Sequence, residues 1–424
     1  MNLYLGLDFG TSGARAILID SRAQVHAVAK RSYNIESVET WQSTLFDLID
    51  RIPPELRFSI NAIAIAATSA TILICDSFGQ PVSQPLLYHD GRGSAVLAKL
   101  SSFVPEGHIV IGATSSLAKL VWWYEQHLKR LGNNVSLYLQ HQADRIGFLL
   151  HGKLGVSDYH NALKLGYDIL ELRYPDWLTS WQSSIQLPRV LTPGVPIAPI
   201  KPELAAKFGL SPSCSICAGT TDSTAAFLAS VGTDASPGQA VTSLGSTLVL
   251  KVLSQDRVED ARYGIYSHRL GDRWLVGGAS NTGGNALSQF FSDRELVQLS
   301  EQINPDWPSQ LDYYPLSKPG ERFPVSDPQK LPRLQPRPDN PVEFLHGLLE
   351  SIARIEAEGY RLLQSLGASP VYSVCSIGGG ASNRTWERIR SRYLQVPLMT
   401  AQHSEAAYGA ALLALQNAQS EPSV

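Results

Sequence analysis

One strand–turn–strand pattern occurs twice in this 424-residue chain. LYLGLDFGTSGARAILID, residues 3–20, places a turn of glycine and hydroxyl residues between two apolar segments, and AVTSLGSTLVLKVL, residues 240–253, has the same layout. A repeated hairpin with its own apolar strands indicates two domains built on one plan. We therefore expect an N-terminal lobe over 1–229 and a C-terminal lobe over 230–424, with the two turns facing each other across a cleft.

The periodicity of apolar residues predicts an α/β fold with a mixed sheet in each lobe. Leu3–Leu7, Ala14–Asp20 and Val25–Ala29 indicate a three-strand meander, and apolar residues spaced three and four apart predict a helix over Leu117–Leu131. The alanine- and leucine-rich segment Glu405–Leu415 predicts a final helix. We expect that helix, about residues 403–420, to pack back on the N-terminal lobe.

Two further segments have clear patterns. Between Arg57 and Asp76 there is no charged residue, but Thr68, Ser69 and Thr71 interrupt the apolar run, so two buried strands joined by a turn are favoured over a membrane span. The residues from 304 to 341 are rich in proline, which predicts an irregular surface segment.

Composition narrows the class of partner. With 44% hydrophobic and 17% charged residues and a net charge of −3, the chain lacks the basic excess typical of nucleic-acid binding, so small molecules are the expected partners. The N-terminus has no signal-peptide pattern, and we expect a cytoplasmic protein. Four cysteines are too few for a disulfide framework in a chain of this size. Cys214 and Cys217 have redox spacing, but an apparent strand there would direct them to opposite faces.

The first turn has the composition of an anion-binding turn. Backbone N–H groups and hydroxyls at Gly10, Thr11, Ser12 and Gly13 can converge on a phosphate. Asp8 precedes them, and a carboxylate beside a phosphate requires a cation between the two, so Asp8 is a candidate Mg²⁺ anchor. The alternative is an ordinary hairpin in which Asp8 caps nearby N–H groups.

Two other glycine-containing turns suit a nucleotide. Gly245, Ser246 and Thr247 form the second hairpin turn, with Ser243 where the first has Asp8, and no P-loop pattern occurs in the chain. Gly378, Gly379 and Gly380 follow the apolar strand Tyr372–Ile377 and precede a helix start at Asn383 and Trp386. Such a turn allows close approach of a flat ligand, and Asn383 is free to hydrogen-bond a base or a ribose. The alternatives are a plain hairpin and a tight strand-to-helix turn.

GTTD, residues 219–222, lies between an apolar strand, Ile216–Ala218, and a helical segment, Ser223–Ala229. Asp222 is a candidate general base, because phosphoryl transfer to a hydroxyl uses a carboxylate within hydrogen-bond reach of the attacking O–H. The alternative is that Asp222 serves as an N-cap for the helix.

Taken together and in order, these segments resemble the FGGY family of carbohydrate kinases, whose two lobes each have an actin-like, ribonuclease-H-like fold. The resemblance runs nearly end to end. DFGTSG (8–13) is similar to the family's first phosphate motif, SLGST (243–247) to its second and IGGGASNRTW (377–386) to its adenosine motif. HDGR (89–92) resembles the sugar-binding Trp-x-Asp-x-Arg with Tyr88 in place of Trp; DYHNA (158–162), NTGGNAL (281–287), PGERFP (319–324) and EAAYGAALLA (405–414) match further signatures.

The resemblance implies a role for each matching residue. Asp222 would be the catalytic base, Asp8 the Mg²⁺-linked carboxylate and Thr11 a γ-phosphate contact. The implied sugar pocket consists of Asp8, Ser69, Ala70, Asp90 and Asp222, with help from Arg92. The implied ATP contacts are Gly10, Thr11, Ser12, Gly245, Ser246, Thr247, Gly284, Gly379, Gly380, Asn383 and Trp386. The family further implies ATP and Mg²⁺, a small sugar as substrate, no nucleic acid or membrane partner, and a monomer or homodimer.

The substrate implied by the resemblance is a ketopentose phosphorylated on its terminal hydroxyl. Xylulose and glycerol kinases carry Gln or His in the turn corresponding to ATSAT (67–71), whereas TSATILI is similar to a stretch of D-ribulose kinases, which favours D-ribulose, giving D-ribulose 5-phosphate. D-Xylulose is the alternative. An actin-like or chaperone-like ATPase without sugar chemistry, and a catalytically idle sugar sensor, remain as hypotheses from other classes. The stretch between Arg92 and Ser115 is shorter than in many members of the family.

Overall fold

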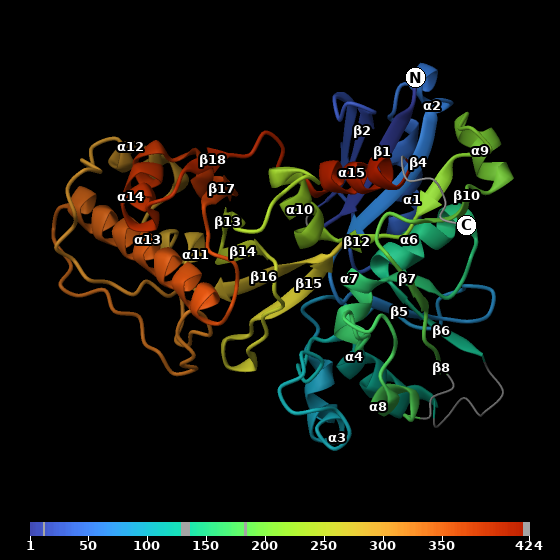
Figure 1. The fold of residues 1–424 in the computed structure, drawn as a ribbon, viewed down its shortest axis with the longest axis horizontal. Helices are drawn as coiled ribbons and strands as arrows, with labels where there is room; N and C mark the ends of the chain where they lie inside the picture. The colour runs from blue at the N-terminus through green and yellow to red at the C-terminus, as the bar shows by residue number, and fades with distance from the viewer. Residues whose placement is uncertain (12, 129–135, 182–184, 419–424) are drawn as a thin grey trace. The chain divides into compact units, whose positions relative to one another are not determined.

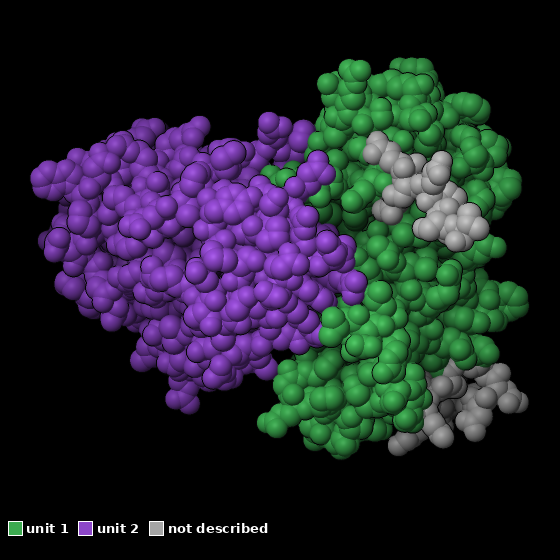
Figure 2. All heavy atoms as spheres, in the orientation of Figure 1, with its two compact units in different colours: residues 1–233, 405–424 green, residues 234–404 purple. Residues whose placement is uncertain are grey.

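The computed structural model describes residues 1–11, 13–128, 136–181 and 185–418 (Figure 1). The chain folds into two compact units, which Figure 2 colours separately. Unit 1 contains residues 1–233 together with those from 405 onward, and unit 2 contains residues 234–404. The predicted Ser12 contact lies outside the described residues.

Unit 1 is built on a sheet with the strand order β10-β11-β4-β1-β2-β3. The first three strands of the chain form the antiparallel meander predicted from the sequence, while β4 and β11 join it in parallel. The short strand β12 also pairs with β4. The bounds are β1 Leu3–Phe9, β2 Ala14–Asp20, β3 Val25–Arg31, β4 Ile60–Ala67, β10 Pro196–Pro199, β11 Ser215–Cys217 and β12 Thr220–Thr221.

Both faces of this sheet are covered by helices, which agrees with the burial of all of β1 and of β4 from Ala62 onward. On one face, α1 (Val38–Asp50), α6 (Gln142–His151) and α9 (Pro202–Phe208) contribute to a single apolar core. On the other, α10 (Asp222–Val231) and α15 (Ala406–Ala418) pack over β1 and β4 (Figure 1). The final predicted helix therefore exists, and it belongs to the core of unit 1.

A smaller three-stranded sheet in unit 1 has the order β5-β6-β8 and its own apolar core. The strands are β5 Ile72–Cys75, β6 Leu137–His141 and β8 Ile185–Gln186. The uncharged segment between Arg57 and Asp76 indeed forms two buried strands, β4 and β5, which belong to different sheets. The helix expected over 117–131 is α4, Ser116–Trp123, followed by a π-helical turn to Leu128; the residues after Leu128 lie outside the described ranges.

Unit 2 repeats the arrangement of unit 1. Its sheet has the order β15-β16-β14-β13-β17-β18, in which β13 pairs antiparallel with β14 and parallel with β17. Strands β16-β14-β13-β17-β18 thus have the order and directions of β3-β2-β1-β4-β11. The bounds are β13 Gln239–Leu244, β14 Leu248–Ser254, β15 Tyr266–Leu270, β16 Arg273–Ser280, β17 Ser373–Ile377 and β18 Leu398–Thr400. The hairpin repeat seen in the sequence reflects this topology.

The helices of unit 2 include one long element, α13 (Pro341–Ser365), whose buried face packs on β14 and β16. The others are α11 Gly284–Leu287, α12 Asp293–Ser300 and α14 Arg384–Leu394. As predicted, no helix or ladder strand occurs between Asn304 and Asn340, all of which the structure describes. The remaining short elements of unit 1 are α2 Pro54–Arg57, α3 Leu97–Leu100, α7 Tyr159–Ala162, α8 Asp176–Thr179, β7 Val156–Asp158 and β9 Arg189–Leu191.

All four cysteines are buried thiols. Cys214 lies in the core under one face of the large sheet and Cys217 in the core under the other, which agrees with the predicted strand geometry. Burial raises the pKa of both to about 12, so neither thiol forms the reactive thiolate at neutral pH. Within the described ranges, none of the helices combines the length and the apolar character needed to cross a bilayer.

Candidate active site

Two carboxylates lie at the same edge of the large sheet in unit 1. Asp8, near the end of β1, pairs in register with Ala66 of β4, and on the other side of β4 the same Ala66 pairs with Thr220 of β12. Asp222 follows β12 directly and opens α10. Because β1, β4 and β12 run parallel, their carboxyl ends meet at one edge, where ligands bind in open α/β sheets.

The environment of Asp8 disfavours its negative charge. Its residue is only 4% exposed, and burial raises its pKa to about 7, with the charge of Asp222 as the next largest cause. Arg15 of β2 opposes the shift, since its Nη1 lies 3.7 Å from Asp8 Oδ2. The other oxygen, Oδ1, is buried and has no hydrogen-bond partner among the described residues. The alternative in which Asp8 caps the turn is therefore not observed.

An unpaired carboxylate oxygen of this kind fits a divalent cation. Mg²⁺ in phosphoryl-transfer sites is commonly held by one or two carboxylates, by water and by the phosphates of the substrate. Within the part of the chain that the structure describes, no three His, Cys, Asp or Glu side chains gather to form a complete metal site. Asp8 thus suits a cation that arrives with a phosphate ligand.

Asp222 occupies the first turn of α10, where the helix N-terminus favours a negative charge. Its Oδ1 accepts a 2.6 Å hydrogen bond from the backbone N–H of Ser223. The N-cap position belongs to Thr221, so Asp222 is not the N-cap considered from the sequence. Its carboxylate is partly exposed at the same sheet edge as Asp8 and therefore remains accessible to a ligand.

A hydrogen-bond chain connects the first glycine turn to the loop after β4. The Tyr33 hydroxyl donates to the carbonyl of Gly10 at 2.7 Å and accepts from Gln142 Nε2 at 3.2 Å. Gln142 Oε1 in turn accepts from the backbone N–H of Thr68 at 3.2 Å and from its hydroxyl at 2.6 Å. Sequence reasoning missed Tyr33 and Gln142, because neither belongs to a motif and both act through contacts distant in sequence.

The loop after β4 contains Ser69 and Ala70, two of the predicted sugar contacts. Ala70 is buried and has φ of +63°, a left-handed conformation that costs a non-glycine residue about 1 kcal/mol. Ser69 is partly exposed. Since Ala67 of β4 pairs with Phe9 of β1, this loop leaves the sheet at the edge where Asp8 lies.

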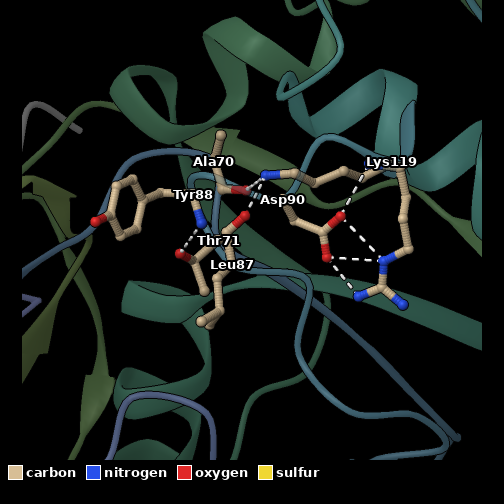
Figure 3. A network of polar contacts seen from close by, with 7 residues as sticks. Ala70, Thr71, Leu87, Tyr88, Asp90 and Lys119 are labelled. Carbon is tan, nitrogen blue, oxygen red and sulfur yellow. Dashed lines mark hydrogen bonds and ion pairs between the residues drawn. The ribbon is translucent and has the colours of Figure 1, made fainter. Parts of the chain in front are cut away.

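Asp90 and Arg92 form a tight pair in the segment that follows β5 (Figure 3). Arg92 Nε lies 2.9 Å from Asp90 Oδ2, and its guanidinium stacks over Trp122 with 4.7 Å to the ring centroid. The side-chain and backbone hydrogen bonds from Arg92 lower the pKa of Asp90 against the opposing effect of burial. Tyr88, at the position of the family's Trp, is 40% exposed.

The first glycine turn has the expected shape. Gly10 donates its N–H to Gly13 O at 3.1 Å, closing the hairpin, and Thr11 is exposed at the tip. An exposed hydroxyl in this position is available to a phosphate. The assignment of Gly10 and Thr11 as phosphate contacts remains a prediction.

Unit 2 contains a cavity of about 760 Å³, a size typical of small-molecule sites. Seven of the predicted nucleotide contacts line it: Gly245, Ser246, Gly284, Gly379, Gly380, Asn383 and Trp386. Thr247 is not among the lining residues. The sequence did not predict that α12 forms another wall, with Asp293, Leu296, Val297 and Ser300 and with the C-cap residue Glu301. The structure gives α12 a capping box formed by Ser292 and Glu295, and no motif of the sequence pointed to a ligand there.

Close contacts explain two of the three glycines that follow β17. Gly378 has φ of +86°, and a Cβ there would lie 2.9 Å from the carbonyl of Leu244. A Cβ at Gly380 would lie 2.5 Å from the ring of Trp386. The carbonyls of Gly245 and Ser246 accept hydrogen bonds from the N–H groups of Gly284 and Asn285 at 2.8 and 3.0 Å. These carbonyls are therefore already paired.

Asn383 differs from the expectation that its amide is free for a base or ribose. Its Oδ1 caps α14 by accepting from the Trp386 N–H at 2.9 Å, and its Nδ2 donates to Ser300 Oγ at 2.8 Å. Trp386 is 4% exposed and donates from Nε1 to Leu349 O at 3.2 Å. Both residues line the cavity, but their polar groups mainly hold α12, α13 and α14 together.

Family models match nearly the whole chain. The N-terminal domain of the FGGY family of carbohydrate kinases matches residues 3–229, and the C-terminal domain of the same family matches residues 240–418. Among curated proteins, the xylulose kinase of Bacillus subtilis (strain 168) is 24% identical over 451 residues, which cover 98% of this chain and 88% of that protein.

Solved structures share the fold. A protein described as a xyloylose kinase from Brucella ovis aligns with a TM-score of 0.85 at 22% identity, covering 99% of this chain and 92% of that one. The glycerol kinase of Plasmodium falciparum, solved with ADP, aligns with a TM-score of 0.84 at 16% identity, covering 99% and 90%. Together with the repeated sheet order, these likenesses confirm the predicted two-lobed, actin-like α/β fold.

Proposed function

The chain belongs to the FGGY family of carbohydrate kinases, and from this premise we propose that it transfers the γ-phosphate of ATP to the terminal hydroxyl of a ketopentose. The observation that carries the proposal is the pair of carboxylates, Asp8 and Asp222, at one edge of the unit 1 sheet. Asp8 is suited to hold a cation and Asp222 to accept a proton. Phosphoryl transfer to an alcohol requires both, because the phosphates carry negative charge and the attacking hydroxyl loses its proton.

In the proposed reaction Asp222 is the general base. The sugar hydroxyl gives its proton to the Asp222 carboxylate as the hydroxyl oxygen bonds to the γ-phosphorus. The bond from that phosphorus to the β,γ-bridging oxygen breaks, and ADP leaves with the electron pair. A positioned base contributes roughly 10²–10⁴ to the rate of such a step. Mg²⁺ bound through Asp8 would neutralise charge on the phosphates.

The nucleotide is assigned to the cavity of unit 2. Its mixture of apolar side chains and backbone glycine positions suits a flat base and its ribose, and Gly379, Gly380 and Trp386 form the wall nearest α14. Because Asn383 uses its amide within the protein, we assign it the role of shaping this wall. Thr11 is assigned to the γ-phosphate.

D-Ribulose is the substrate we propose first, and D-xylulose the alternative. The loop with Ser69 and Ala70 offers the sugar only small side chains, in contrast to a long polar side chain such as Gln or His. The name xylulose kinase of the Bacillus subtilis relative supports D-xylulose equally. Both sugars are ketopentoses with a terminal hydroxyl.

The proposal is tested by measuring ADP release with saturating MgATP and D-ribulose, D-xylulose, L-ribulose or glycerol. We expect a ketopentose to raise turnover well above the sugar-free background and a phosphorylated pentulose to accumulate in equal amount to ADP. ATP hydrolysis that no sugar stimulates would overturn the proposal and favour an actin-like ATPase. Sugar binding without turnover would favour the idle sensor.

A further inference from the structure

We propose that Lys119 is a positioning residue that fixes the two loops of the sugar site, 68–71 and 87–90, to each other. The inference rests on the sugar site proposed above. Lys119 belongs to none of the motifs and is placed by α4, in the apolar sequence SLAKLVWW. A single cation within such a segment is the only sign of its role in the sequence.

Lys119 contacts both loops through its side-chain nitrogen. It is 0% exposed, and its Nζ donates hydrogen bonds to Ala70 O at 2.9 Å and to Leu87 O at 2.6 Å (Figure 3). Ala70 follows the predicted sugar contact Ser69, and Leu87 precedes Tyr88 and Asp90. One ammonium group therefore connects the backbone on one side of the site to the backbone on the other.

A second contact joins the same two loops. The backbone N–H of Tyr88 donates to Thr71 Oγ1 at 3.0 Å (Figure 3). Thr71 Oγ1 also lies 2.7 Å from Thr68 Oγ1. Through Thr68 this contact joins the Gln142–Tyr33 chain that ends at Gly10. The sugar loops and the first glycine turn thus belong to one hydrogen-bonded network.

The backbone conformation of Ala70 indicates what Lys119 contributes. A left-handed alanine persists only where its surroundings determine it. Lys119 Nζ donates its hydrogen bond to the carbonyl of this same residue, so it fixes the orientation of the peptide group between Ala70 and Thr71. Charge-assisted hydrogen bonds are about twice as strong as neutral ones, which makes an ammonium well suited to this task.

Burial and the neighbouring charges act on the pKa of Lys119 in different directions. Burial lowers the pKa of Lys119 to about 7, while Asp90 opposes the shift and Lys164 and Arg92 add to it. Asp90 is itself a proposed sugar contact. The carboxylate of Asp90 is engaged by Arg92. The hydrogen bonds of Lys119 are made to the two loop carbonyls instead.

The experiment compares Lys119→Met with Lys99→Met, a matched change at an exposed lysine of α3 that pairs with Glu125 at 2.6 Å. We expect Lys119→Met to raise the KM and the calorimetric Kd for the sugar by about 10-fold or more, the cost of losing charged hydrogen bonds. The KM for ATP and the kcat at saturating sugar should stay within about twofold of wild type. Lys99→Met should change none of them.

An unchanged sugar KM in folded Lys119→Met overturns the inference. A parallel loss of ATP affinity and kcat overturns it too, since that pattern indicates general damage to the fold. Where Lys119→Met gives no folded protein, Thr71→Val removes the second contact between the loops; a selective rise in sugar KM supports the inference and an unchanged KM overturns it. A wild-type protein without sugar-dependent turnover would instead refute the proposed function, before any variant is compared.

Discussion

After burial, the negative charge of Asp222 is the largest cause of the raised pKa of Asp8, although the two residues belong to different structural elements far apart in sequence. Strand β4 accounts for this relationship, because its Ala66 pairs with Asp8 on one side and with Thr220 on the other. Neither carboxylate is placed by the first hairpin alone. The candidate site requires the parallel strands that arrive later in the chain.

Replacing Asp222 by Asn should lower kcat by about 10²–10⁴, because an amide cannot take the proton of the sugar hydroxyl. The KM for ATP should change little, since the assigned nucleotide cavity lies within unit 2. Steady-state kinetics with the best sugar of the panel measure both values. Ser223→Ala, one residue further along α10, is the matched control. A kcat within 10-fold of wild type would exclude Asp222 as the base.

Asp8→Asn should stabilise the protein at pH 8. The folded state raises the pKa of Asp8 from 3.8 to about 7, so between these values the folded protein binds a proton that the unfolded chain releases. The contribution of Asp8 to stability therefore falls as the pH rises from about 4 to 7 and stays low above 7. Removing the charge recovers a free energy on the order of 2–4 kcal/mol at pH 8.

The melting temperature of Asp8→Asn and wild type, measured without nucleotide or Mg²⁺, tests this prediction. The advantage of the variant should be full at pH 8 and shrink as the pH falls through 7 towards 4. Asp176→Asn, at a carboxylate whose side chain is 91% exposed, should show no such trend. An advantage that does not depend on pH would argue against the raised pKa. The same variant should require more Mg²⁺ for turnover.

Gly380→Ala should weaken nucleotide binding and lower the melting temperature, because its Cβ would lie 2.5 Å from the Trp386 ring and displace the cavity wall. Its neighbour supplies the control: a Cβ at Gly379 meets no atom within 4 Å, so Gly379→Ala should melt like wild type. Calorimetry with ATP and thermal melting measure the two effects. Equal melting temperatures for both variants would show that the wall yields without cost.

Gly409→Ala should destabilise unit 1 by about 1–3 kcal/mol or more, as is usual for overpacking. A Cβ at this position of α15 would lie 1.9 Å from the carbonyl of Ala225 in α10, a backbone atom that cannot rotate away. Gly112→Ala, whose Cβ would meet only Ile109 O at 3.7 Å, should be tolerated. Urea unfolding followed by tryptophan fluorescence compares them. A variant as stable as wild type would show that α15 can shift.

Local patterns in the sequence were sufficient for much of the fold. Alternating apolar segments predicted the meander and the second hairpin, and the uncharged run around Thr68 gave two buried strands. These features depend on neighbours close along the chain, where periodicity and turn chemistry act directly.

The candidate site was only partly predictable, because several of its contacts join distant segments. Lys119 meets Ala70 and Leu87, and Gln142 meets Thr68 and Tyr33, through pairings that no spacing encodes. Asn383 shows the converse: the sequence suggested an amide free for a base or a ribose, and in the structure its side chain caps α14. The residue types indicated which chemistry the site could perform, whereas the hydrogen-bond partners of each side chain depend on packing between distant segments.

The placement of α15 has a consequence for how the protein is made. Ala407, Ala411 and Ala414 complete a core that includes Tyr4, Ile17 and Ile19 from the opening strands of the chain. A ribosome releases that helix only after it has synthesised all of unit 2. Until then α10 is the helix available to that face of the first sheet, and the apolar surface that α15 buries stays uncovered.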